Sequence, residues 1–231
     1  MRLFYDANIK KSDSTFTLTE EESKHVVRVL RMKEGDRIAL LNGKGDSFTC
    51  EIIDAHPKRC DLKIREHSHK EKPKYDIHIA ISPTKQLDRM EWFVEKATEI
   101  GATEITLISC KNQERSKVKV DRLLKKAISA MKQSHRAYLP IINELDGFNN
   151  FVKNHSKGLI AHCYENPKEK FEASFRKTNC PILIGPEGDF TQEEIAFALQ
   201  NGYKTITLGE NRLRTETAGV YVCVRSKLLL E

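Results

Sequence analysis

The sequence predicts an α/β protein in which a small β-barrel domain precedes a larger domain with a mostly parallel sheet. Short apolar stretches separated by tight turns fill residues 1–70, which is typical of a small barrel. Apolar strands alternate with amphipathic segments over residues 73–231, which is typical of an α/β domain. The polar residues 67–74, which end around Pro73, predict the linker, so we expect the domains at 1–70 and 73–231.

The first domain is expected to contain one helix and several short strands. Thr19, followed three residues later by Glu22, predicts a helix start, and apolar positions extend that helix to Leu30. Basic residues recur every three positions along it and are expected on one face: His25, Arg28 and Arg31. A turn at residues 42–46, Asn-Gly-Lys-Gly-Asp, predicts a hairpin. The strands are expected at residues 37–41, 47–53 and 60–65.

The second domain is expected to alternate strands and helices. Apolar runs predict strands at residues 77–81, 105–108, 140–142, 159–161, 182–184 and 206–208. Helices are predicted at residues 86–100, with Gly101 as the stop, and after the basic segment at residues 123–131. Residues 220–230 are apolar on most faces, so we expect this last helix to pack on a second subunit as well as on its own core.

The net charge of +6 is concentrated in one segment. Residues 111–132 carry eight basic and two acidic side chains, so the rest of the chain is neutral. The basic residues are Lys111, Arg115, Lys117, Lys119, Arg122, Lys125, Lys126 and Lys132. A concentrated basic patch favours a polyanionic partner such as nucleic acid, and the alternative is a solvated helix face.

Other broad classes are disfavoured by composition. No run of eighteen apolar residues is present and the N-terminus lacks the apolar stretch of a signal peptide, so we expect a cytoplasmic protein without a membrane span. The six cysteines are scattered without metal-binding spacing, so we expect reduced thiols and no metal site.

Two loops carry the strongest functional signal. Residues 185–188, Gly-Pro-Glu-Gly, follow an apolar strand, and Thr191 with Glu194 then predicts a capped helix. Glycines at the carboxyl end of a parallel strand let the backbone approach a ligand closely, and the alternative is a tight corner. The second loop, residues 209–218, carries Arg212, Arg214 and Glu216 just before the apolar helix, for which the alternative is a surface ion pair.

Together these stretches resemble ribosomal RNA small subunit methyltransferase E, a family of the SPOUT superfamily. Further blocks that match the family are residues 25–31 with Gly35-Asp36, residues 85–101, and residues 133–140. Five blocks in the family's order cover nearly the whole chain. Asp189 departs from the pattern, because the family more often has a second glycine there.

The resemblance implies a PUA-like barrel, a SPOUT domain with a C-terminal trefoil knot, and a homodimer. It implies S-adenosylmethionine as cofactor and methylation of N3 of a decoding-region uridine in the 16S rRNA of the small ribosomal subunit. The implied cofactor-binding residues are Ile184, Gly185, Pro186, Glu187, Gly188, Leu208, Gly209, Leu213, Arg214, Thr215, Thr217 and Ala218.

Uracil N3 carries a proton at neutral pH, so its methylation requires a base. Glu216 is the first candidate and Glu187 the second, while Arg214 is expected to stabilise the developing uracil anion. The residues expected to bind RNA are His25, Arg28, Arg31, Arg115, Lys117, Arg122, Lys125, Lys126 and Arg136. Two alternatives remain open at this point: a SPOUT enzyme that methylates a tRNA ribose 2′-oxygen, and a non-catalytic ribosome-binding factor.

Overall fold

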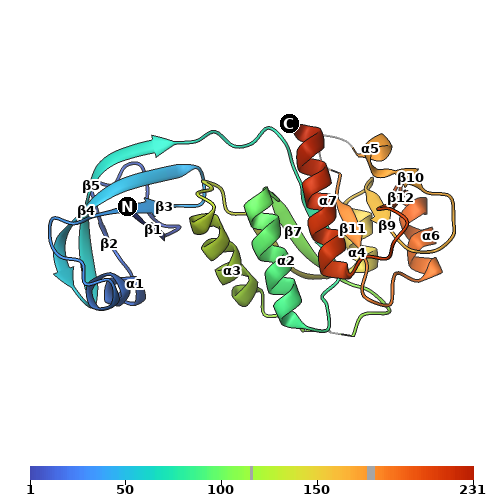
Figure 1. Ribbon diagram of the computed structural model, residues 1–231, viewed down its shortest axis with the longest axis horizontal. Helices are drawn as coiled ribbons and strands as arrows, with labels where there is room; N and C mark the ends of the chain where they lie inside the picture. The colour runs from blue at the N-terminus through green and yellow to red at the C-terminus, as the bar shows by residue number, and fades with distance from the viewer. Residues whose placement is uncertain (115–116, 176–179) are drawn as a thin grey trace. The chain divides into compact units, whose positions relative to one another are not determined.

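The computed structural model describes residues 1–114, 117–175 and 180–231, and its backbone packing divides the chain into two units (Figure 1). The first unit contains Met1–Lys72 together with Met131–Leu139, and the second contains Pro73–Ala130 together with Pro140–Glu231. The segment at Met131–Leu139 therefore packs with the first unit, although the sequence analysis placed it in the second domain.

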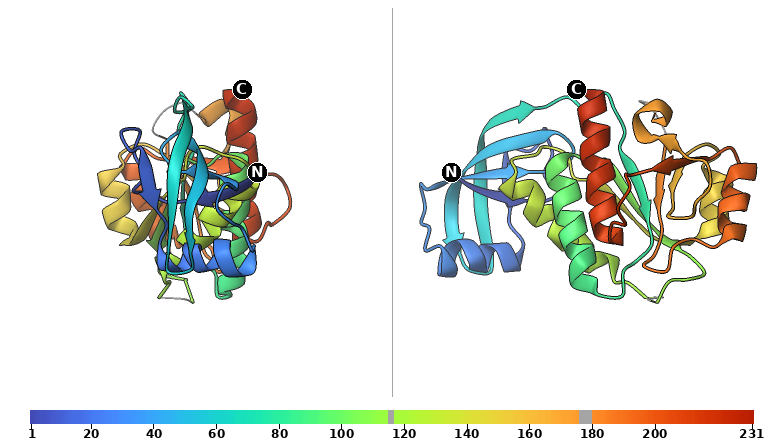
Figure 2. Two further views of the ribbon diagram at one scale, coloured as in Figure 1. Left: turned by 90° about the vertical axis from the view of Figure 1, so that its left-hand side faces the viewer. Right: turned by 45° about the vertical axis from the view of Figure 1, so that its right-hand side comes forward.

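The first unit is built on a five-stranded sheet in the order β1-β3-β4-β5-β2. Its strands are β1 (Arg2–Tyr5), β2 (Thr15–Thr17), β3 (Arg37–Leu41), β4 (Asp46–His56) and β5 (Arg59–His69). The long antiparallel strands β4 and β5 lie side by side (Figure 2, left). Their inward side chains, Phe48, Cys50 and Leu62, form the core with Phe4 and Leu40. The predicted hairpin is confirmed, whereas the predicted linker was wrong at its start, because residues 67–69 belong to β5.

The helix of the first unit changes type halfway. Thr19 caps α1 (Glu20–Lys24) by accepting a hydrogen bond from the Glu22 amide at 3.3 Å. The chain then forms a π-helix, η1 (His25–Val29), in which the Leu30 amide donates to the His25 carbonyl at 2.9 Å. A π-turn holds more residues than an α-turn, and Arg31 follows the helix with a φ of +54°. The spacing of the basic residues therefore differs from that of a regular α-helix, and His25, Arg28 and Arg31 are all exposed.

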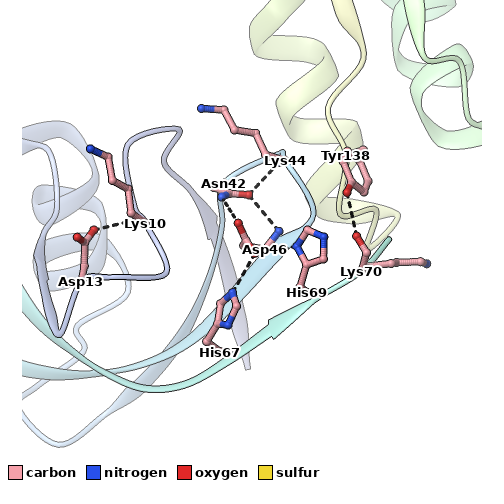
Figure 3. Close-up of polar contacts among 9 residues, drawn as sticks. All are labelled: Lys10, Asp13, Asn42, Lys44, Asp46, His67, His69, Lys70 and Tyr138. Carbon is pink, nitrogen blue, oxygen red and sulfur yellow. Dashed lines mark hydrogen bonds and ion pairs between the residues drawn. The ribbon is translucent and has the colours of Figure 1, made fainter. Parts of the chain in front are cut away.

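The hairpin turn of the first unit is hydrogen-bonded to the backbone of residues 137–139. Figure 3 shows the side chains around this turn, where the Tyr138 hydroxyl donates to the Lys70 carbonyl at 2.9 Å. The Asp46 carboxylate accepts hydrogen bonds from His67 Nε2 at 2.9 Å and His69 Nδ1 at 2.8 Å. These bonds lower the pKa of Asp46 to about 2, that with His67 contributing most. The Gly45 amide donates to the Ala137 carbonyl at 3.0 Å. At a φ of +103°, a Cβ on Gly45 would lie 2.8 Å from His69 Cε1, so this approach requires glycine.

The second unit contains a seven-stranded sheet in the order β10-β12-β9-β11-β6-β7-β8, and all its paired strands are parallel. Its strands are β6 (His78–Ile81), β7 (Glu104–Ser109), β8 (Ile141–Gly147), β9 (Leu159–Ala161), β10 (Glu169–Lys170), β11 (Ile182–Ile184) and β12 (Lys204–Thr207). The prediction of an α/β domain with a mostly parallel sheet is confirmed.

Helices cover both faces of this sheet. On one face, α2 (Leu87–Ile100) and α7 (Thr215–Leu230) lie side by side (Figure 1), and a Cβ on Gly219 of α7 would lie 2.6 Å from the Phe93 ring and 3.0 Å from Ile81. On the other face, α4 (Phe148–Asn154) and α6 (Gln192–Gln200) share a core with Ile160 and Leu183. The remaining helices are α3 (Val120–Gln133) and α5 (Phe171–Ser174).

The last helix exposes part of its apolar surface. On α7, Val222 and Cys223 are fully buried, whereas Val224, Leu228 and Leu229 are exposed. A second subunit was expected to pack on this helix, and these exposed side chains are the apolar surface that its own core leaves uncovered. Within the described part of the chain, no helix has the length and apolar character that a membrane crossing requires.

Candidate active site

A cavity of about 720 Å³ opens where strands β9, β11 and β12 end. The loop after each strand forms one of its walls, and the first turn of α7 closes the lining at Thr215 and Ala218. Ligands of open α/β sheets bind at the carboxyl ends of the strands, which is where this cavity lies. The lining comprises residues 161–165, Lys168, residues 184–189, residues 206–215 and Ala218.

The loop after β11 is held from outside the cavity. The Asp189 amide donates to the Pro186 carbonyl at 2.9 Å, which closes a tight turn. Asn112 Nδ2 donates to the carbonyls of Gly188 and Asp189, both at 3.1 Å. A Cβ on Gly188 would lie 3.1 Å from Asn112 Cβ, so the glycine permits this close contact. These bonds fix the turn before any ligand enters.

Asp189 joins two walls of the cavity. Its φ of +63° lies in the left-handed region, which Asp tolerates better than most residues. Its Oδ1 accepts from the Phe190 amide and its Oδ2 from the Cys163 amide, both at 2.8 Å. A glycine would suit the same backbone but would not make the bond to Cys163. The departure from the family pattern therefore provides a link between the loops after β9 and β11. Burial, together with the Asp189 charge, raises the pKa of the Cys163 thiol.

The helix after this turn begins as predicted. Thr191 Oγ1 accepts from the Glu194 amide at 3.2 Å, and Glu194 accepts from the Thr191 amide at 2.8 Å. Phe190 and Ile195 belong to one buried cluster, so the hydrophobic staple is also present. Glu194 also accepts from the Lys111 amide at 2.9 Å, which ties α6 to the segment after β7.

The loop after β12 is tied to the loop after β11 by a partly buried hydrogen bond. Thr215, the first residue of α7, donates its hydroxyl to the Gly185 carbonyl at 3.0 Å. Gly209 bends the chain with a φ of +125°, and its amide donates to Thr207 Oγ1 at 3.2 Å. Both predicted loops are thus positioned against each other by contacts within the protein.

The structure brings most of the expected cofactor-binding residues together. Those that line the cavity are Ile184, Gly185, Pro186, Glu187, Gly188, Leu208, Gly209, Leu213, Arg214, Thr215 and Ala218. Thr217 is exposed on α7 and is not part of the lining. The loop after β9, residues 162–165 and Lys168, also lines the cavity but was not predicted from the sequence. A three-residue strand followed by a polar stretch without glycine carries no recognisable ligand signal.

The three catalytic candidates lie in different surroundings. Glu187 and Arg214 line the cavity, and Glu187 Oε1 accepts from the Lys85 amide at 3.1 Å. Glu216 is buried outside the lining, with its Oε1 3.8 Å from Arg89 Nε. Its Oε2 has no hydrogen-bond partner within the described residues. Of the two acidic candidates, Glu187 is the one that belongs to the lining of the cavity.

The expected RNA-binding residues are only partly available. Lys117, Arg122 and Lys125 are exposed, and Lys126 is half-buried. Arg122 and Lys126 both form ion pairs with Glu91, that of Lys126 at 3.7 Å. Because the Glu91 carboxylate is nearly buried, these two cations compensate its charge within the second unit. Arg136 is half-buried in the first unit, and Arg115 lies outside the described residues.

No three His, Cys, Asp or Glu side chains are grouped so as to hold a metal ion in the parts of the chain that the structure describes.

Family models match both parts of the chain. A model described as an RNA methyltransferase domain matches residues 70–226, and one described as an RNA methyltransferase PUA domain matches residues 18–65. These matches place the chain among the RNA methyltransferases. Ribosomal RNA small subunit methyltransferase E of Buchnera aphidicola subsp. Acyrthosiphon pisum is 30% identical over 226 residues, covering 89% of this chain and 84% of that protein. The chain belongs to the ribosomal RNA small subunit methyltransferase E family.

Solved structures agree with this assignment. A probable rRNA methyltransferase from Porphyromonas gingivalis is 38% identical, with a TM-score of 0.89 over 99% of this chain and 98% of that chain. A protein from Legionella pneumophila assigned as a methyltransferase, in complex with bound S-adenosylmethionine, is 25% identical. Its TM-score is 0.85, over 98% of this chain and 96% of that chain. The predicted family and the PUA-like character of the first domain are thereby confirmed.

Proposed function

We propose that this protein methylates N3 of a decoding-region uridine in the 16S rRNA of the small ribosomal subunit, with S-adenosylmethionine as methyl donor. The observation that carries the proposal is the cavity at the ends of β9, β11 and β12, because it gathers the two loops that the family shares. The relative from Buchnera is named for small-subunit rRNA methylation, and the related structure from Legionella holds the cofactor.

The cavity suits a ligand of this size and chemistry. Its volume of about 720 Å³ lies in the usual range for small-molecule sites. Backbone groups of the loops after β11 and β12 hold the cofactor, and Thr215 keeps these loops together. S-adenosylmethionine, when bound, supplies a methyl group that is already activated on a sulfonium. The protein therefore contributes mainly orientation of the acceptor nitrogen and removal of its proton.

Glu187 accepts the N3 proton, because it is the candidate carboxylate that lines the cavity. Arg214, also in the lining, stabilises negative charge on the uracil oxygens. Glu216 faces Arg89 and positions the first turn of α7. Loss of a general base slows a reaction by about 10²–10⁴-fold. We therefore expect Glu187→Gln to abolish most activity and flatten the rate–pH profile, and Glu216→Gln to keep the profile of the wild type. The reverse pattern would make Glu216 the base.

Exposed basic residues of both units contact the rRNA phosphates. We assign this role to His25, Arg28 and Arg31 in the first unit and to Lys117 and Lys125 in the second. Within the predicted domains, residues 1–70 therefore act only in RNA binding, whereas residues 73–231 catalyse methyl transfer and add the phosphate contacts of Lys117 and Lys125. Filter binding of 16S rRNA at several salt concentrations tests it, because loss of a phosphate contact lowers the salt dependence.

The proposal includes a cytoplasmic homodimer and a C-terminal trefoil knot. The exposed apolar side chains of α7, Val224, Leu228 and Leu229, support a dimer through this helix. Light scattering after size-exclusion chromatography is expected to give a dimer for the wild type and a monomer for Leu228→Glu. A monomeric wild type would refute the dimer.

Calorimetric titration with S-adenosylmethionine, followed by methyl transfer to 16S rRNA, tests the function itself. We expect binding and one methyl group per rRNA. Binding without transfer to rRNA but with transfer to tRNA would favour the ribose 2′-O-methyltransferase alternative. Absence of cofactor binding would favour the non-catalytic ribosome-binding factor.

A further inference from the structure

His162 lines the cavity between the two loops that carry the functional signal. It directly follows β9, the strand that lies between β12 and β11 in the sheet. Ala161, the last residue of β9, is in register with Ile184 on one side and Ile206 on the other. The same register places His162 between Gly185, the first residue after β11, and Thr207, the last residue of β12.

The backbone around His162 is anchored, whereas its ring is not hydrogen-bonded. Lys168 Nζ donates to the His162 carbonyl at 3.1 Å, and Asp189 holds the next amide at 2.8 Å. His162 belongs to the lining of the cavity, yet only 7% of the residue is exposed. Neither Nδ1 nor Nε2 has a hydrogen-bond partner within the described residues. Buried polar atoms are rarely left without partners, so a ring in this state indicates a ligand that supplies them.

The surroundings of the ring favour its neutral form. Burial lowers the pKa of His162, and the Lys168 charge lowers it further, against an opposing effect of Asp189. A neutral imidazole offers one donor and one acceptor. Ribose hydroxyls and the edge of adenine present the same neutral combination. The amino-acid end of the cofactor carries full charges instead, and Lys168 lines the same cavity as a charged partner for its carboxylate.

We propose that His162 binds the nucleoside part of the cofactor through both ring nitrogens and thereby sets the protein's affinity for adenosine-containing ligands. This inference rests on the proposed function, because it takes S-adenosylmethionine as the ligand of the cavity. His162 is a positioning residue in this account, since it touches the part of the cofactor that does not react.

The experiment is calorimetric titration with two ligands, S-adenosylmethionine and 5′-methylthioadenosine, which lacks the amino-acid end. The variants are His162→Phe, which keeps the ring shape without its nitrogens, and His162→Gln, which keeps a donor and an acceptor. His56→Phe is the matched control, because His56 is exposed in the first unit. Circular dichroism and thermal unfolding confirm that each variant is folded, and His162→Gln carries the test should His162→Phe fail to fold.

We expect His162→Phe to weaken both ligands by a similar factor of about 10, as loss of hydrogen bonds to a buried polar site does. We expect a smaller loss for His162→Gln and none for His56→Phe. Unchanged affinities in folded His162 variants, or weakening of S-adenosylmethionine alone, would overturn the inference while leaving the proposed function intact. Failure of the wild type to bind either ligand would instead refute the proposed function, and the inference with it.

Discussion

The hydrogen bond from Thr215 to Gly185 holds the loops after β11 and β12 together, so removing it should lower both the stability of the protein and its affinity for the ligand. Thr215→Val removes the hydroxyl that donates to the Gly185 carbonyl at 3.0 Å while keeping the branched shape of the side chain. Thr215 is 4% exposed, so water does not readily replace the lost donor. A net loss of about 1 kcal/mol is typical of one such bond. We expect this loss to lower the melting temperature by about 2–4 °C for a chain of this length.

The same bond should also affect ligand affinity. Once the loops after β11 and β12 separate in the variant, ligand binding must first bring them together. This costs up to about the same 1 kcal/mol, so the affinity for S-adenosylmethionine should fall about fivefold. Thr217→Val is the matched control, since Thr217 is exposed in the same helical turn. Surface changes of this kind usually stay within about 0.5 kcal/mol.

Thermal unfolding and calorimetric titration of both variants measure the two effects. Equal affinities of Thr215→Val and the wild type would refute the reasoning that this bond organises the cavity. A loss of the same size in Thr217→Val would also refute it, because the effect would then belong to the helix start in general.

Three further predictions concern the body of the protein. Gly45→Ala should lower the free energy of unfolding, measured by denaturant titration, by more than Gly35→Ala does. Both glycines have a positive φ, which costs an alanine about 1–2 kcal/mol. Of the two, only Gly45 has neighbours that a Cβ would meet, and this overlap adds about 1–3 kcal/mol. Equal losses would show that close packing at this turn is unimportant. The folded-state pKa of Asp46, about 2, lies below its ordinary value of 3.8, so its stabilisation is complete above pH 4 and is lost as the pH falls through about 2. The stability advantage of the wild type over Asp46→Asn, about 1 kcal/mol after solvent screening, should therefore shrink over that range, and a constant difference would contradict the assignment. Lys125→Glu should weaken rRNA binding and leave the melting temperature unchanged. Lys126→Glu should weaken rRNA binding and also lower the melting temperature, because it breaks an ion pair with the buried Glu91. Identical behaviour of the two variants would refute this distinction.

Local signals in the sequence predicted local features well. The turn at residues 42–46 and the capping pair Thr191 and Glu194 both act within a few residues, and both are present as predicted. The Gly-Pro-Glu-Gly turn was also placed correctly at a strand end, because an apolar run before glycines and a capped helix after them leave little choice of geometry.

Features that depend on partners distant in sequence were not predictable. Residues 137–139 join the first unit through backbone bonds to the hairpin turn, and backbone groups carry no sequence signature. Glu216 was placed by its position in a motif, whereas the side chain it faces, Arg89, lies far away in the sequence. The place of His162 in the cavity follows from the pairing of β9 with β11 and β12, which the sequence alone does not show.

The proposed activity is methylation of 16S rRNA at N3 of one uridine. The direct measurement is nucleoside mass spectrometry of 16S rRNA from a strain that lacks the protein, before and after treatment with the purified protein and S-adenosylmethionine. We expect N3-methyluridine to be absent before treatment and present at about one per rRNA afterwards, within a decoding-region fragment. Unmethylated rRNA, or a methyl group on a ribose oxygen, would contradict it.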